Sequence, residues 1–288
     1  MIDAMIMFIF CNNIMQFDNK LTDSPCLLGK GTCFDEKTLN TIQKKSTSYT
    51  FSSCKNTDKD CIVSKLKEKT KCNDEECVVE KLAENNVIDK NTADDIILKR
   101  FKQRGPRNNT NLLSNVDIDG VLTKYSFVFP DFYHHKFQMI DFEEQAKYDN
   151  SSLGSFDYAQ HINKYSNLGV VINTDKTHGQ GIHWFAVFID FKANPITIEY
   201  FNSSGREPPN EIIIWKNNVI NKLKNLNNPR NAQFVRVSRT VHQKQNTECG
   251  VYALYYIISR LYGVPYKNFD TKGIPDEYMT QFRKVIFR

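Results

Sequence analysis

The stretch "HWFAVFIDFKANPITIEYF" (residues 183–201) predicts the centre of a β-sheet. Its first nine residues are dense in aromatic and β-branched side chains, which favour strands. The tetrapeptide "KANP" (192–195) is typical of a turn, and "ITIEYF" (196–201) then returns as a second strand. An antiparallel pairing about this turn brings the start of the hairpin next to the residues that follow its end.

The segments on both sides of this hairpin indicate an α+β fold. "LGVVINT" (168–174) predicts a strand, whereas "PPNEIIIWKNNVINKLKNL" (208–226) has apolar residues at helical spacing. "AQFVRVSRTV" (232–241) alternates like a strand, and "CGVYALYYIISRLYG" (249–263) indicates a buried helix. We therefore expect a mixed or antiparallel central sheet that is flanked by helices.

The segment before the hairpin predicts one helix and two strands. "NLLSNVDIDGVLTKY" (111–125) indicates a helix that starts near Ser114 or Asn115. "SFVFPDF" (126–132) and "FQMIDF" (137–142) resemble strands because they combine aromatic and branched residues.

Two domains are expected, a helical and cysteine-rich arm with a basic linker over 1–105 and a core domain over 106–288. Segments 35–45, 60–66, 76–82 and 91–101 predict short helices, the last with Asn91 or Thr92 as its cap. The linker "KRFKQRGPRNNTN" (99–111) is polar, basic and interrupted by glycine and proline. We interpret it as a solvated segment, with weak nucleic-acid or scaffold contact as the alternative.

Composition excludes several classes of protein. The net charge of +5 is too small and too dispersed to indicate a nucleic-acid-binding protein. No run reaches the roughly 18–20 apolar residues that span a bilayer, so no membrane contact is expected. "MIDAMIMFIF" (1–10) lacks the basic start of a signal peptide. It predicts a buried strand or helix, or a start upstream of the true one at Met5, Met7 or Met15.

Seven of the eight cysteines lie before residue 78. Because no secretion signal is evident, we expect them to be thiols, with Cys61 and Cys77 facing each other between two helices. The spacings from Cys54 through Cys61 and Cys72 to Cys77 do not match the paired cysteines of zinc ribbons. No metal and no cofactor are predicted.

The eighth cysteine, Cys249, stands alone at the expected start of a helix. Unpaired amides at a helix N-terminus favour a thiolate, so we expect a lowered pKa and a nucleophile. His183 is the histidine that begins a strand, and the hairpin brings it to Asn202, which could orient the imidazole. Gln243, six residues before Cys249, could donate to an oxyanion, with Gln245 as its rival.

Taken together, "GIHWFAVFIDF", "EYFNSSG" and "QKQNTECGVYAL" resemble the ubiquitin-like-protein-specific cysteine proteases. That clan includes SUMO-removing proteases, the adenovirus maturation protease and the polyprotein proteases of large DNA viruses such as African swine fever virus, whose branch is the most similar. The resemblance covers residues of roughly 110–265. It implies Cys249 as nucleophile, His183 as general base and acid, Asn202 as orienter and Gln243 as oxyanion donor.

The resemblance also implies a substrate. Members of the African-swine-fever-type branch suggest an endopeptidase that cleaves viral structural polyproteins after Gly-Gly-X-like sites during virion maturation, in the virion and the infected-cell cytoplasm. Trp184 would form one wall of a narrow cleft, Gly250 would let the substrate backbone come close, and Leu112 stands where many members carry a tryptophan.

Other interpretations stay open at this point. The same chemistry on an isopeptide bond would give a deSUMOylase or deubiquitinase, and related folds include acetyltransferases and inactive binding modules. Taken singly, Cys249 and Trp184 could be core residues, and Asn202 could simply form a turn.

Overall fold

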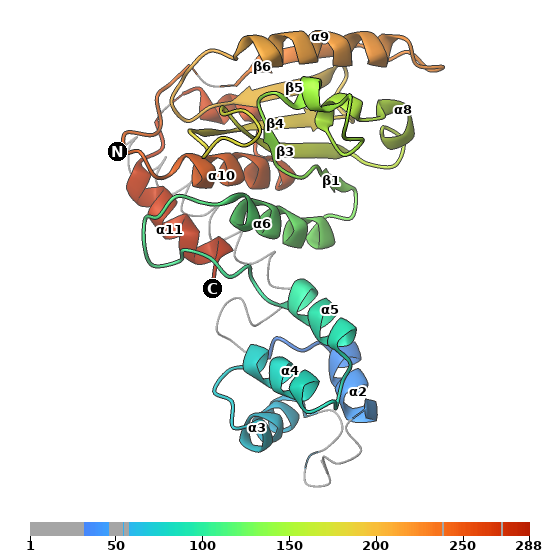
Figure 1. Cartoon of the computed structure of the whole chain (residues 1–288), viewed down its shortest axis with the longest axis vertical. Helices are drawn as coiled ribbons and strands as arrows, with labels where there is room; N and C mark the ends of the chain where they lie inside the picture. Colours follow the sequence, from blue (N-terminus) through green and yellow to red (C-terminus); the bar gives the residue numbers. More distant parts are fainter. Residues whose placement is uncertain (1–31, 46–53, 55–57, 238, 272) are drawn as a thin grey trace. The chain divides into compact units, whose positions relative to one another are not determined.

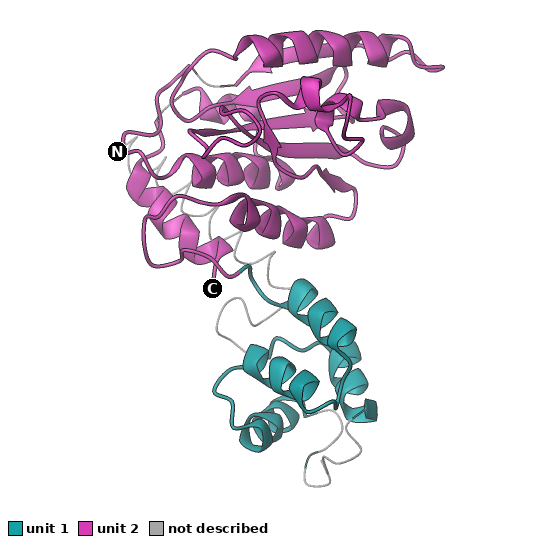
Figure 2. Ribbon diagram, in the orientation of Figure 1, with its two compact units in different colours: residues 1–103 teal, residues 104–288 magenta. Residues whose placement is uncertain are grey.

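The computed structural model describes residues 32–45, 54, 58–237, 239–271 and 273–288. The chain divides into two compact units, residues 1–103 and 104–288 (Figure 2). The strand or helix expected within residues 1–10 lies outside the described residues.

The second unit is built on a mixed sheet, which in the described part of the chain has six strands in the order β1-β3-β4-β5-β6, with β2 also paired to β3. Strand β4 pairs antiparallel with both β3 and β5. Strands β1 and β2 pair with β3 in parallel, and β6 pairs with β5 in parallel. The strands are β1 (Phe132–His134), β2 (Gln138–Met139), β3 (Asn167–Asn173), β4 (Trp184–Asp190), β5 (Ile196–Phe201) and β6 (Ala232–Arg236). The expected α+β fold is confirmed.

Helices cover both faces of this sheet (Figure 1). On one face, α9 (Asn210–Lys224) buries Ile212, Trp215 and Val219 against alternate residues of β3, β4 and β5. On the other face lies α10 (Cys249–Leu261), whose first eleven residues are all buried, with α6 (Asn115–Val128) and α11 (Asp276–Ile286) packed against it. The shorter helical segments are α7 (Phe142–Gln145), η3 (Leu153–Ser155), α8 (Tyr158–His161) and η4 (Tyr266–Phe269).

The start of α6 is fixed by its own sequence. Ser114 is the N-cap, and Ser114 and Asp117 form a reciprocal capping box. Leu113 before the cap and Ile118 in the next turn are both buried, as expected for a hydrophobic staple. The predicted start of the helix is correct, and the staple holds Leu113 in one position.

Some boundaries differ from the expected ones. Residues 126–128 are helical and not a strand, because the buried face of α6 continues through Tyr125. The final strand stops at Arg236, well before residue 241. Helix α11 was not predicted; it buries Met279, Phe282 and Ile286 along one face.

The first unit is helical, as expected. Its described helices are α2 (Glu36–Lys45), α3 (Lys59–Thr70), α4 (Glu75–Glu84) and α5 (Lys90–Arg100), around a common apolar core. An aspartate caps each of the last three, Asp58, Asp74 and Asp89, by accepting a backbone N–H. The cap of α5 is therefore Asp89 and not Asn91 or Thr92.

Two pairs of cysteines in this unit form disulfides, which corrects the expectation of free thiols. Cys54 bonds Cys61, and Cys72 bonds Cys77, with Cα–Cα distances of 5.8 and 5.7 Å. The second cysteine of each pair lies in the first turn of a capped helix, Cys61 in α3 and Cys77 in α4, and its partner is seven or five residues earlier. Cys61 and Cys77 consequently have separate partners and do not face each other.

None of the helices in the described ranges is long and apolar enough to cross a membrane. Among the same residues, no group of three or more histidine, cysteine or acidic side chains is arranged to hold a metal ion.

Candidate active site

The two ends of the β4–β5 hairpin bring His183 and Asn202 together. His183 immediately precedes β4, and Asn202 immediately follows β5, whose last residue pairs with Ala186. The imidazole Nε2 of His183 lies 2.8 Å from the amide oxygen of Asn202. The contact expected from the hairpin is present in the structure.

Asn202 is held rigidly in place. Its side chain is buried, its Nδ2 donates to the hydroxyl of Tyr200 at 2.9 Å, and its Oδ1 also accepts bonds from Ser204. Because Nδ2 is used on Tyr200, the oxygen is the atom that faces His183. The imidazole must then carry its proton on Nε2, which leaves Nδ1 as the basic nitrogen.

Cys249 is the first residue of α10 and is almost completely buried. The backbone N–H of Trp184 donates to its sulfur, and the amide of Gly250 also favours the thiolate. Trp184 directly follows His183, so this contact brings the backbone next to the predicted base to the predicted nucleophile.

The pKa of Cys249 is raised, which corrects the expectation of a lowered one. Burial is the largest cause, because it penalises the thiolate more than the amides at the start of α10 stabilise it. The negative charge of Glu248 acts in the same direction. Burial likewise lowers the pKa of His183, against the raising effect of its bond to Asn202.

Both groups are consequently neutral near pH 7, which makes the pH profile of activity a test. We expect kcat/KM to be lost on the acid side with a midpoint below 6.5, the ordinary value for histidine, because only unprotonated His183 can accept the thiol proton. Initial rates measured from pH 5 to 9 would show this. An acid midpoint at or above 6.5 would contradict the lowered pKa of His183.

Gln243 is bonded to Ser203, the residue that follows Asn202. Its Oε1 accepts a bond from the hydroxyl of Ser203 at 2.8 Å, and its Nε2 donates to the carbonyl of Gln245 at 2.6 Å. An amide nitrogen carries two N–H groups, so the predicted role of Gln243 as oxyanion donor requires the second of them. The side chain of Gln245 is exposed, so the geometry favours Gln243.

Trp184 and Gly250 pack together with Leu113 to form an apolar wall, next to Cys249 in the chain. The indole Nε1 of Trp184 donates to the carbonyl of Leu113 at 3.1 Å, and a Cβ on Gly250 would lie 3.1 Å from Leu113 and 3.3 Å from Trp184. The glycine thus makes room for Leu113 and Trp184, whereas the sequence suggested room for substrate. Leu112 itself is 60% exposed, and Leu113 is the residue that meets Trp184.

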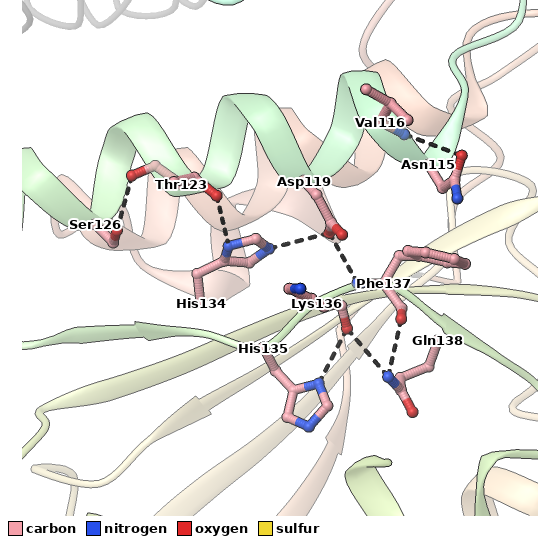
Figure 3. A network of polar contacts seen from close by, with 10 residues as sticks. All are labelled: Asn115, Val116, Asp119, Thr123, Ser126, His134, His135, Lys136, Phe137 and Gln138. Carbon is pink, nitrogen blue, oxygen red and sulfur yellow. Dashed lines mark hydrogen bonds and ion pairs between the residues drawn. The ribbon is translucent and has the colours of Figure 1, made fainter. Parts of the chain in front are cut away.

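Phe137 is a second aromatic residue at this wall that the sequence analysis did not identify. Its ring meets that of Trp184 edge to face, with centroids 6.2 Å apart. Asp119 on α6 fixes this position, because its carboxylate accepts the backbone N–H of Phe137 at 2.8 Å and lies 3.2 Å from Nε2 of His134 (Figure 3). Only this tertiary contact, and no sequence pattern, reveals its place.

His242, seven residues before Cys249, serves the core. It is buried, its Nδ1 accepts the backbone N–H of Ile274, and burial lowers its pKa to about 4. The imidazole is neutral at pH 7, and its Nδ1 is used on the backbone of Ile274, whereas the imidazole of His183 bonds Asn202.

Comparisons with known proteins find similar sequences. The model of the Ulp1 protease family, C-terminal catalytic domain, matches residues 122–288. A cysteine protease of African swine fever virus is 37% identical over 199 residues, which cover 66% of this chain and 72% of that protein. A SUMO-1 cysteine protease of another isolate of the same virus is also 37% identical over the same shares.

Structural comparison gives the same result. The crystal structure of the African swine fever virus protease matches with a TM-score of 0.69 and 30% sequence identity, over 90% of this chain and 92% of that chain. His183, Asn202, Gln243 and Cys249 all lie within the region that the family model matches.

Proposed function

The chain belongs to the Ulp1 protease family and is a cysteine protease, and we propose that it cleaves viral structural polyproteins at Gly-Gly-X-like sites during virion maturation. The observation that carries the site assignment is the chain of contacts from Asn202 to His183 and from the amide of Trp184 to the sulfur of Cys249. The viral origin of the similar proteases supports the maturation role and a location in the virion and the infected-cell cytoplasm.

The geometry supports a general-base mechanism. Nδ1 of His183 takes the thiol proton as the sulfur of Cys249 attacks the scissile carbonyl, and Asn202 stabilises the imidazolium that forms. The oxyanion accepts bonds from Gln243 and from amides at the start of α10. His183 then protonates the leaving amine, and a water molecule activated by the same imidazole hydrolyses the thioester.

The preference for glycine follows from the wall beside the thiol. Trp184 contacts the ring of Phe137, the carbonyl of Leu113 and the space beside Gly250, and this packing would narrow the approach of a substrate to Cys249. A Cβ on the substrate next to the scissile bond would displace the carbonyl from the sulfur. Glycine avoids this displacement.

Peptides can measure this preference. We expect replacement of either glycine of a Gly-Gly-X peptide by alanine to lower kcat/KM about 100-fold, as a displacement near 1 Å does. The control is an alanine introduced four residues away, which should change the rate little. Equal cleavage of all three peptides would contradict the proposed glycine preference.

Removal of a ubiquitin-like modifier is the second candidate, favoured by the similarity to a protein named SUMO-1 cysteine protease. Thiol-trapping probes based on SUMO and ubiquitin, compared with a Gly-Gly-X peptide, separate the two functions. Adducts with a probe but no peptide cleavage would favour the isopeptidase. Acetyl transfer from acetyl-CoA, or no reaction at all, would indicate the acetyltransferase or the binding module.

Mass spectrometry of candidate virion polyproteins after incubation with the enzyme would identify the substrate directly. The helical unit over 1–103 is proposed to position the substrate or a scaffold, and weak nucleic-acid contact through the basic linker is the alternative.

A further inference from the structure

A buried arginine from α11 reaches the residue that precedes the nucleophile. Arg283 is fully buried, and its Nε donates to the carboxylate of Glu248 at 2.8 Å. Its Nη2 donates to the carbonyl of Asn111 at 2.8 Å, and longer bonds of 3.4 Å reach the carbonyls of Pro106 and Thr247. One guanidinium therefore joins α11, the segment before α6 and the turn into α10.

Glu248 needs this cation. Its side chain is buried, its Oε2 accepts the bond from Arg283, and its Oε1 has no hydrogen-bond partner among the described residues. A buried carboxylate with a single strong partner depends on that partner for its charge. Glu248 adjoins Cys249 in the chain, and its charge acts on the thiol.

The same helix also holds the other end of this loop. Asp276, in the first turn of α11, accepts the backbone N–H groups of Lys244 and Gln245 at 3.0 and 2.9 Å. Its other oxygen accepts the hydroxyl of Tyr252 on α10. The loop from Gln243 to Cys249 is thus fixed by α11 at both ends.

We propose that Arg283 is a positioning residue of the active site, which neutralises Glu248 beside Cys249 and fixes the turn that carries the nucleophile. The proposal deepens the proposed function and rests on Cys249 being the nucleophile. Besides Arg283 and Glu248, the charged or titratable groups around this turn include Asp276 on α11, Tyr252 on α10 and the exposed Lys244 in the loop.

The two members of the pair should act on the thiol in opposite directions. Burial raises the pKa of Glu248 even beside Arg283, so without Arg283 this carboxylate is ionised mainly at alkaline pH, where its uncompensated charge disfavours the thiolate. Without the charge of Glu248, Arg283 becomes an excess cation and favours the thiolate. A residue that only stabilised the fold would not produce effects of opposite sign.

The test is the rate at which iodoacetamide alkylates Cys249 in the full chain from pH 6 to 10, followed by peptide mass spectrometry. For Arg283→Met we expect alkylation at pH 9 to be roughly threefold to tenfold slower, and for Glu248→Gln alkylation at pH 7 to be faster by a similar factor. Arg283→Lys should keep the wild-type profile but lower kcat, because it retains the charge and loses the bonds to the carbonyls.

Arg260→Met is the matched control. It breaks another buried Arg–Glu pair on the same helix as Cys249, with Glu199, away from the thiol. We expect its alkylation profile to match that of the wild type. Alkylation is compared at a temperature at which every variant is folded. Tryptophan fluorescence reports this, since both tryptophans lie in the unit over 104–288.

If Arg283→Met does not fold, Glu248→Gln alone still decides, because an unchanged or slower alkylation would overturn the proposal. Equal profiles for Arg283→Met and the wild type, or a shift of the same size in Arg260→Met, would also overturn it. Failure of the proposed function has a different signature, which is full protease activity after Cys249 has been alkylated.

Discussion

Replacing Cys249 with alanine is expected to lower kcat/KM for peptide cleavage on the order of 10⁴-fold or more, the scale seen when a protease loses its nucleophile. The physical reason is that no other described free thiol stands beside His183, since Cys249 is the free cysteine of the described part of the chain. The measurement is a progress curve with wild-type and variant enzyme at equal concentration.

The control for this variant is folding. Alanine removes one small buried atom group at the start of α10, so the thermal transition followed by tryptophan fluorescence should move little compared with the loss of activity. Wild-type activity in a folded Cys249→Ala protein would exclude Cys249 as the nucleophile and direct attention to another site.

The hairpin and the order of the candidate site residues along the chain could be predicted, because both depend on short stretches of sequence. Residues 183–201 have the pattern of two strands joined by a turn, and an antiparallel hairpin brings its two ends together. The contact between His183 and Asn202 therefore follows from the sequence. The position of Cys249 at the start of a helix could be predicted for the same reason. These features need only the geometry of a strand and a helix.

Packing features could not be predicted from the same sequence. Residues 126–128 have strand-forming side chains but continue α6, since the buried face of that helix decides their conformation. The contact of Phe137 with Trp184 and the reach of Arg283 to Glu248 join segments far apart in the chain. The raised pKa of Cys249 likewise depends on burial, which outweighs the local effect of the helix start.

The cysteines of the first unit show a related limit. Their spacing excluded a zinc ribbon but did not indicate the bonds from Cys54 to Cys61 and from Cys72 to Cys77. The second cysteine of each pair lies in the first turn of a helix that an aspartate caps, Asp58 or Asp74, and no spacing rule indicates its partner.

Replacing Arg260 with methionine is expected to destabilise the unit over 104–288 by about 3–5 kcal/mol, the cost of breaking a buried ion pair from one side. Glu199 on β5 is fully buried, and Arg260 on α10 binds it through Nε at 2.8 Å and Nη2 at 3.0 Å. Removal of the guanidinium leaves a carboxylate in the core with only the hydroxyls of Tyr256 and Thr197. Urea unfolding followed by tryptophan fluorescence reports on this unit, because it contains both tryptophans.

The double variant Glu199→Gln with Arg260→Met separates the charge from the packing. If the cost comes from an uncompensated carboxylate, the neutral amide should recover part of the lost stability, because Gln can keep bonds to both hydroxyls without a buried charge. A double variant that is less stable than Arg260→Met would contradict this account. It would instead show that the cation–π contact between the guanidinium of Arg260 and the ring of Phe188 is what joins α10 to the sheet.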